Sequence, residues 1–213
     1  MSRGTLVAMG AAAERRERLR DEFRREIVGA ARRIVVEDGY AALTMRRIGE
    51  AIGYSAASIY QYFANRDAIA GALMEEGFVE LVEAFAPAAT IADPLSRLKA
   101  VGRAYVRFGL TRPETYRLMF MEDPKITAGV LEGSAGENSA GMRAYAAILE
   151  PLVQLFERGR LRDDLTPPVA ADVMWISLHG LVSLKLTCPK FPATPDDALL
   201  DATMETLACG LLQ

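Results

Sequence analysis

Cysteine and histidine are scarce in this sequence of 213 residues. Its two cysteines, Cys188 and Cys209, form no CxxC pair, which excludes a zinc finger and a disulfide framework. The single histidine, His179, cannot be half of a two-histidine metal site. So few cysteines favour a reducing, cytoplasmic location. We therefore expect a cytoplasmic protein with no metal and no other cofactor.

Long uninterrupted apolar runs are also missing. The best stretch, Val173 to Leu184, contains Ser177, His179 and Ser183, and it is typical of a buried helix rather than of a membrane span. The sequence therefore predicts no membrane partner.

The N-terminal segment lacks the charged-then-apolar order of a signal peptide. A weak apolar patch precedes the charges, and Met9 is an alternative start to Met1. We expect residues 1–18 to form a disordered extension outside the fold.

The charge is distributed unevenly along an otherwise ordinary globular composition, which is 51% apolar and 25% charged. Up to Arg66 the chain has 12 basic and 8 acidic residues, whereas the rest has 13 basic and 20 acidic residues. Such asymmetry favours one part that faces polyanions and one that does not. We predict a first domain over residues 19–66 and a second over residues 67–213.

The hydrophobic periodicity predicts an all-α fold of about nine helices. Apolar residues recur at steps of three and four in a first helix over residues 19–37, for example Phe23, Ile27 and Ile34. Later helices begin where a proline follows a capping residue, at Pro94, Pro113, Pro167 and Pro195. A long helix over residues 138–160 contains Pro151, which we expect to kink or split it.

Residues 43–63 follow the pattern of a helix-turn-helix. Thr44 is a good N-cap for a first short helix, Gly53 suits the tight turn, and Ser55 is an N-cap for the second. Ile48 and Ile59 are placed to hold the two helices at a fixed angle. The outward face of the second helix is then free to enter a major groove.

The predicted groove-facing residues are small or hydrogen-bonding. We expect hydroxyl contacts with phosphates from Thr44, Ser55, Tyr60 and Tyr62, cationic contacts from Arg46 and Arg66, base-edge contacts from Ser58 and Gln61, and thymine-methyl contacts from Ala56 and Ala57. The alternative from spacing alone is that the helix pair binds nothing, because most short pairs with a glycine turn do not, and that Tyr60 and Tyr62 are ordinary half-buried aromatics.

The segment TMRRIGEAIGYSAASIYQYFANRDAI resembles the N-terminal signature of the tetracycline-repressor (TetR) family. The positions in register with the family pattern are Thr44, Ile48, Gly53, Ser55, Tyr60, Tyr62 and Phe63. Gly49 stands where the family prefers alanine, and Arg66 stands where it prefers lysine. The resemblance covers residues 19–68 and implies a sequence-specific DNA-binding regulator, most often a repressor.

Two further patches, PETYRLMF at residues 113–120 and WISLHGLV at residues 175–182, resemble a Trp-His-Gly subgroup of ligand-binding domains in this family. The resemblance implies a pocket for a small, mainly apolar effector. The candidate lining residues are Tyr105, Phe108, Tyr116, Met119, Phe120, Tyr145, Met174, Trp175 and His179. The alternative for each of them is a place in the hydrophobic core.

The last two helices, over residues 168–186 and 195–212, are expected to build a homodimer as a four-helix bundle. Leucine and methionine recur along them at helical steps, at Leu181, Leu184, Leu199, Leu200, Met204, Leu207 and Leu211. A two-fold dimer matches double-stranded DNA with a palindromic operator.

Three other functions remain open at this point. The first is an activator rather than a repressor. The second is a small-molecule-binding protein with a vestigial helix-turn-helix, and the third is an enzyme on a helical scaffold. Nothing in the sequence activates or orients a Cys188–His179 pair as a nucleophile and base, so we expect no enzymatic activity.

Overall fold

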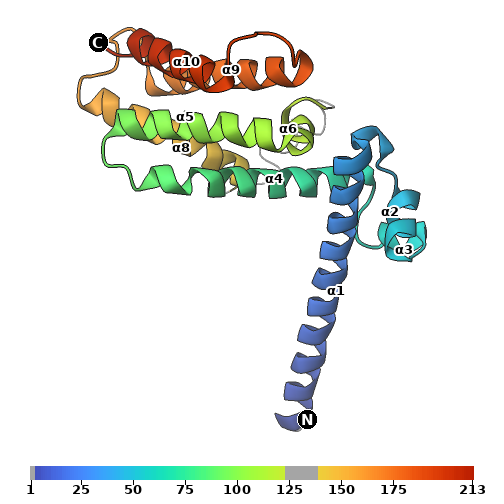
Figure 1. The fold of residues 1–213 in the computed structure, drawn as a ribbon. Helices are drawn as coiled ribbons and strands as arrows, with labels where there is room; N and C mark the ends of the chain where they lie inside the picture. Colours follow the sequence, from blue (N-terminus) through green and yellow to red (C-terminus); the bar gives the residue numbers. More distant parts are fainter. Residues whose placement is uncertain (1–2, 123–138) are drawn as a thin grey trace. The chain divides into compact units, whose positions relative to one another are not determined.

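The computed structural model describes residues 3–122 and 139–213, and in these ranges it is all-helical. Nine α-helices and one short 3₁₀ helix are present in the described ranges (Figure 1). The chain divides into two compact units, Met1–Leu73 and Met74–Gln213. The predicted all-α class with about nine helices is confirmed.

The N-terminal unit contains α1 (Arg3–Asp38), η1 (Tyr40–Ala42), α2 (Met45–Ile52), α3 (Ala56–Tyr60) and the first turns of α4 (Arg66–Ala89). Its core is built from the apolar stripe of α1 and the inward faces of the shorter helices. The fully buried members include Ile27, Ala30, Leu43, Ile48, Ile59 and Ile69.

Two boundaries differ from those predicted. Helix α1 begins at Arg3 rather than near Leu19, so most of the segment expected to be disordered is helical. Residues 11–18 consist entirely of alanine, arginine and glutamate, which all favour helix by their intrinsic propensity. The division between the units falls after Leu73 rather than after Arg66, because Ile69, Ala70 and Leu73 are buried.

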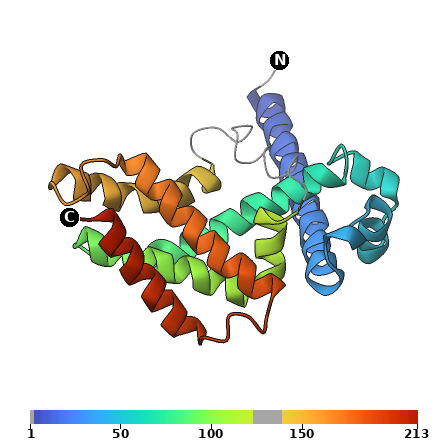
Figure 2. The ribbon, with the colours of Figure 1, turned by 90° about the horizontal axis from the view of Figure 1, so that it is seen from above.

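The C-terminal unit contains the rest of α4, α5 (Pro94–Thr111), α6 (Pro113–Phe120), α8 (Ala140–Glu157), α9 (Pro167–Thr187) and α10 (Asp196–Leu211). Helices α5, α8 and α9 pack on one another, and α10 packs on α5 and α9 (Figure 2). Helix α8 continues through Pro151 as one helix, so the split that we considered there does not occur.

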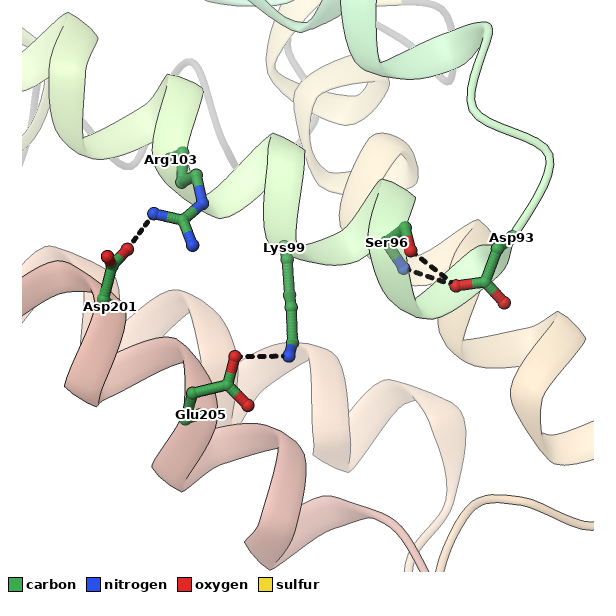
Figure 3. A network of polar contacts seen from close by, with 6 residues as sticks. All are labelled: Asp93, Ser96, Lys99, Arg103, Asp201 and Glu205. Carbon is green, nitrogen blue, oxygen red and sulfur yellow. Dashed lines mark hydrogen bonds and ion pairs between the residues drawn. The ribbon is translucent and has the colours of Figure 1, made fainter.

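Helix α10 is held on α5 by charge as well as by apolar contact. Lys99 Nζ donates to Glu205 Oε1 at 2.6 Å, and Arg103 pairs with Asp201 (Figure 3). At the start of α5, Asp93 Oδ2 accepts from Ser96 N at 2.9 Å and from Ser96 Oγ at 2.7 Å. These bonds lower the pKa of the Asp93 carboxyl.

By length and composition alone, α9 is apolar enough to cross a membrane, contrary to the expectation from its polar interruptions. In the structure, however, Met174, Leu178 and Val182 of α9 are buried in the core of the C-terminal unit. Helix α9 therefore has the packing of a core helix with one exposed face.

Candidate DNA-binding surface and effector-binding region

Two side-chain caps define the helix-turn-helix. Thr44 Oγ1 accepts from Arg47 N at 3.1 Å at the start of α2, and Ser55 Oγ accepts from Ser58 N at 3.2 Å at the start of α3. Gly53 ends α2 with φ 75°, the left-handed conformation that glycine adopts without strain. The three residues were predicted in these structural positions.

The angle between α2 and α3 is set by close packing. Ile48 and Ile59 are fully buried between the helices. A Cβ on Gly49 would lie 2.6 Å from the carbonyl oxygen of Tyr54, so the turn passes too close to α2 for a larger residue. This close approach explains locally why position 49 is glycine rather than the alanine that the family prefers.

Most of the predicted DNA-contacting residues lie at the surface. Thr44, Arg46, Ser55, Ala57, Tyr60, Gln61 and Arg66 are exposed, whereas Ala56, Ser58 and Tyr62 are half-buried. The Arg46 side chain is 86% exposed and sits 3.5 Å from Glu50, while its neighbour Arg47 pairs with Asp38. Arg46 is thus the more available of the two cations.

Two of the predicted contacts also have packing roles. The Tyr62 ring meets the Phe23 ring of α1 edge-on, with centroids 4.8 Å apart. The Arg66 guanidinium lies 5.1 Å from the centroid of the Tyr40 ring and 3.4 Å from Asp67 Oδ1. Tyr60, at 55% exposure, has no such ring contact among the described residues and projects more freely.

Arginines of α1 join this surface, and the sequence reasoning did not single them out. Arg16, Arg20 and Leu19 line an open cleft of about 280 Å³ together with Gln61 and Tyr62. The Arg20 guanidinium lies 5.9 Å from the Tyr62 ring centroid. The sequence signal was available, because Arg16, Arg20 and Arg24 follow one another at four-residue steps on one helix face.

In the C-terminal unit, five of the predicted effector residues form one aromatic cluster with His179. Trp175 contacts Tyr105 (ring centroids 5.3 Å apart), Phe120 (6.0 Å) and Tyr145 (6.2 Å). Tyr116 contacts Phe120 at 4.8 Å and stacks on His179 at 5.8 Å. Rings from α5, α6, α8 and α9 therefore meet at one place.

A chain of hydrogen bonds crosses this cluster. The hydroxyls of Tyr105 and Tyr116 lie 2.9 Å apart, and the Tyr116 hydroxyl lies 2.7 Å from His179 Nδ1. Burial raises the pKa of both tyrosines and lowers the pKa of His179. The three groups are therefore held in their neutral, hydrogen-bonding forms.

The other three predicted effector residues are buried in the core of the C-terminal unit. Met119 packs against Gly77 of α4, and Met174 packs toward Gly102 of α5. Phe108 is also in the core, at 5% exposure.

An open cleft of about 430 Å³ adjoins the aromatic cluster between α8 and α9. Its described lining residues are Gly141, Met142, Tyr145, Asp172, Trp175 and Ile176. Tyr145 donates a hydrogen bond to Asp172 Oδ1 at 2.9 Å. Of the nine residues predicted to bind an effector, Tyr145 and Trp175 line this cleft.

The exposed face of α9 is largely apolar, with Asp172 as its charged member. Val169, Val173, Ile176 and Leu184 are all exposed, with Ile176 at 68%. Of the residues predicted to build the dimer, Leu181, Leu200, Met204 and Leu211 are instead buried, Leu199 and Leu207 are half-buried, and Leu184 is exposed. Helical spacing alone does not tell which apolar stripe faces the chain's own core.

Family comparisons agree with both halves of this arrangement. Residues 27–73 match the family model described as "Bacterial regulatory proteins, tetR family". Residues 98–207 match the model described as "Tetracyclin repressor-like, C-terminal domain". The chain belongs to the TetR family of bacterial transcriptional regulators. TetR-family members bind operator DNA through the helix-turn-helix, have an effector-binding C-terminal domain, and are not enzymes.

Relatives within the TetR family differ in the direction of regulation. A transcriptional repressor of Mycobacterium tuberculosis is 30% identical over 162 residues, which cover 75% of this chain and 80% of the repressor. The transcriptional activator FasR of Mycolicibacterium smegmatis is 31% identical over 116 residues, 52% of this chain and 53% of the activator. The solved structure of the fatty acid degradation regulator FadR from Bacillus halodurans shares the fold, with a TM-score of 0.70 and 18% identity over 87% of this chain and 94% of that one.

Proposed function

We propose that this TetR-family protein is a dimeric repressor that a small molecule releases from its operator. The observation that carries the proposal is the exposed row of hydrogen-bonding residues on a helix-turn-helix, with Ser55, Tyr60 and Gln61 exposed while Ile48 and Ile59 are buried. Because the chemistry is binding alone, repression requires only that the protein occupy promoter DNA. This function belongs in the cytoplasm, where bacterial DNA lies.

Specificity and affinity are divided between different residues of this surface. Gln61 and Ser58 read base edges, and Ala56 and Ala57 contact thymine methyl groups. Thr44, Ser55, Tyr60, Tyr62, Arg46 and Arg66 contact phosphates and so position α3 in the groove.

Arginines of α1 extend the phosphate contacts beyond the predicted set. Arg16 and Arg20 line the same cleft as Gln61. A DNA phosphate backbone that passes Gln61 therefore comes within reach of both guanidiniums. Such contacts raise affinity for all sequences alike.

The dimer forms across the exposed face of α9, with α10 beside it. Val173, Ile176 and Leu184 together offer an apolar surface that a monomer leaves in water. Gly180 lies between them, and a Cβ there would meet nothing within 4 Å, so a partner helix approaches closely. A two-fold dimer then presents two α3 helices to a palindromic operator.

The effector acts at the aromatic cluster around Trp175 and Tyr116, on a helix of the Trp-His-Gly type. Helix α4 carries the response, because it begins in the DNA-binding unit and continues into the effector-binding unit. An effector that favours a conformation with the two α3 helices further apart opposes DNA binding reciprocally, by a coupling of about 1–3 kcal/mol.

Two alternatives are separated from this proposal by experiment. An activator binds the same operator but raises transcription. A small-molecule-binding protein with a vestigial helix-turn-helix shows no sequence-selective, salt-dependent DNA binding. The relative that is matched over the larger share of its own length is a repressor, which favours repression.

Fluorescence anisotropy with duplexes that tile the DNA beside the protein's own coding region tests the proposal, at two salt concentrations. We expect tight binding to one duplex that weakens as salt rises. In the same assay, Gln61→Ala relaxes the preference at one operator position, while Tyr60→Phe weakens binding to all duplexes alike. If every duplex binds no better than a scrambled one, after denaturing extraction and refolding to remove any bound effector, the proposal is wrong.

A further inference from the structure

The cleft between α8 and α9 has an unusual chemical lining for an apolar binding site. Two aromatic rings, Tyr145 and Trp175, lie 6.2 Å apart at an angle of 51°. Met142 and Ile176 add flexible and exposed apolar surface. Asp172 is the one charged residue among the described lining residues, and it is an acid.

The aromatic and acidic groups are held in place. The Trp175 ring is supported from behind by Tyr105 and Phe120, with centroids 5.3 and 6.0 Å away. The Tyr145 hydroxyl donates to Asp172 Oδ1 at 2.9 Å. Burial, together with the bond to Asp172, raises the pKa of Tyr145 to about 12, so the hydroxyl keeps its proton near neutral pH.

These features select one class of ligand. The faces of Trp and Tyr rings attract cations, and a carboxylate beside them adds a full negative charge. A neutral apolar ligand would cover Asp172 without pairing it, and an anion would be repelled by it. The excess of acidic residues after Arg66 also attracts cations from a distance.

We propose that the α8–α9 cleft binds an organic cation with an apolar or aromatic body, with Trp175 and Tyr145 facing the charged centre and Asp172 neutralising it. A volume of about 430 Å³ is within the usual range of small-molecule sites, about 300–1,000 Å³. This assignment deepens the proposed function by giving the effector a charge. The site itself is testable without DNA.

Helix α9 contributes residues to two proposed surfaces, the α8–α9 cleft and the dimer interface. At about 100° per residue, Asp172 and Trp175 lie on the side of α9 toward α8, whereas Val173, Gly180 and Leu184 lie on the other side of Ile176. A dimer across α9 therefore has the Asp172–Trp175 side at the edge of its interface. A cation bound in the cleft then lies next to the dimer interface and acts on it as well.

The test uses two hydrophobic ions of matched shape and opposite charge, tetraphenylphosphonium and tetraphenylborate. Trp175 is the only tryptophan of the chain, so its fluorescence reports on the cleft directly. We expect saturable quenching by the phosphonium, with an affinity at least about tenfold above that of the borate. Calorimetry of the full-length protein provides the stoichiometry.

A matched pair of substitutions removes the same charge inside and outside the cleft. Asp172→Asn weakens phosphonium binding about fivefold, while Asp197→Asn, on the exposed first turn of α10, leaves it unchanged. Tyr145→Phe keeps the ring and loses less affinity than Tyr145→Ala. Equal binding of the two ions, or equal effects of the two aspartate substitutions, would overturn the assignment.

The outcomes separate this assignment from the proposed function. A protein that binds its operator but does not prefer the phosphonium over the borate lacks the cation site and is still a repressor. A protein that binds the phosphonium through Asp172 but has no operator retains the site and loses the proposed regulatory role.

Discussion

The Tyr116 hydroxyl lies 2.7 Å from His179 Nδ1, and the two rings stack with an interplanar angle of 20°. Because burial keeps His179 neutral, Nδ1 is best placed as an acceptor, with the proton on Nε2. Tyr116 then donates to His179 and accepts from Tyr105. The side chains of α5, α6 and α9 are thereby joined by hydrogen bonds inside an otherwise apolar cluster.

Tyr116→Phe breaks this chain and leaves the Tyr105 hydroxyl and His179 Nδ1 without their shared partner. We expect the free energy of unfolding to fall by about 1–3 kcal/mol, since both groups remain buried or half-buried. Urea denaturation measures the change. Tyr145→Phe is the control, because its hydroxyl bond is exposed and its removal costs less; an equal loss in both variants would contradict this role for Tyr116.

We expect the stability of the protein to depend on pH through His179. Burial lowers the pKa of this imidazole below its ordinary value of 6.5, so the unfolded chain takes up a proton before the folded one does. The contribution of the neutral imidazole to the free energy of unfolding is complete above about pH 6.5. It is lost as the pH falls toward the lowered pKa of the folded state. Asp93 and Asp164 have pKa values lowered from 3.8, so their titration changes the stability only in more acidic solution.

His179→Gln removes this titration. We expect the free energy of unfolding of the variant to change less between about pH 6.5 and 4.5 than that of the parent. Chemical denaturation at a series of pH values gives the two curves. Parallel curves would mean that His179 does not titrate differently in the folded and unfolded states.

Arg20→Ala tests the role of α1 in DNA binding. We expect weaker binding to every duplex and a slope of log affinity against log salt that is smaller by about 0.9 for each phosphate that the variant no longer neutralises. Arg18→Ala is the matched control, because Arg18 lies on the opposite face of the same exposed stretch of α1. Anisotropy on a non-specific duplex is sufficient, and equal slopes for the two variants would exclude a phosphate contact from Arg20.

Ile176→Asp tests the dimer. A charge at this 68% exposed position disfavours burial of the α9 face, so we expect the variant to sediment as a monomer and to bind the operator more weakly. Val36→Asp, at a 55% exposed apolar position on α1, controls for the loss of surface hydrophobicity. A dimer that survives Ile176→Asp unchanged would place the interface elsewhere.

Gly49→Ala and Gly71→Ala are expected to have opposite effects on stability. Alanine at position 49 meets the Tyr54 carbonyl oxygen at 2.6 Å, and we expect a net loss of about 1–2 kcal/mol despite the better helix propensity. At position 71 nothing lies within 4 Å of the new Cβ, so the same change stabilises by about 0.5–1 kcal/mol. Thermal unfolding distinguishes them, and a stabilising Gly49→Ala would show that the turn relaxes freely.

Features carried by a few adjacent residues were predictable from the sequence. Thr44, Gly53 and Ser55 act through bonds and angles within one turn of themselves, so their positions follow from residue type and spacing. The all-helical class follows in the same way from apolar periodicity. The start of α1 was missed because residues 14–18 are exposed and show no apolar stripe, while their propensity still favours helix.

Only the tertiary structure decided which of several equivalent apolar faces is buried. Leu200 and Met204 face the chain's own core while Ile176 faces outward, although all three stand at ordinary helical spacings. Tyr116 meets His179, and Tyr145 meets Asp172, through helices separated widely in the sequence. Such pairings depend on the way whole helices pack, and a spacing pattern within one helix carries no information about its neighbour.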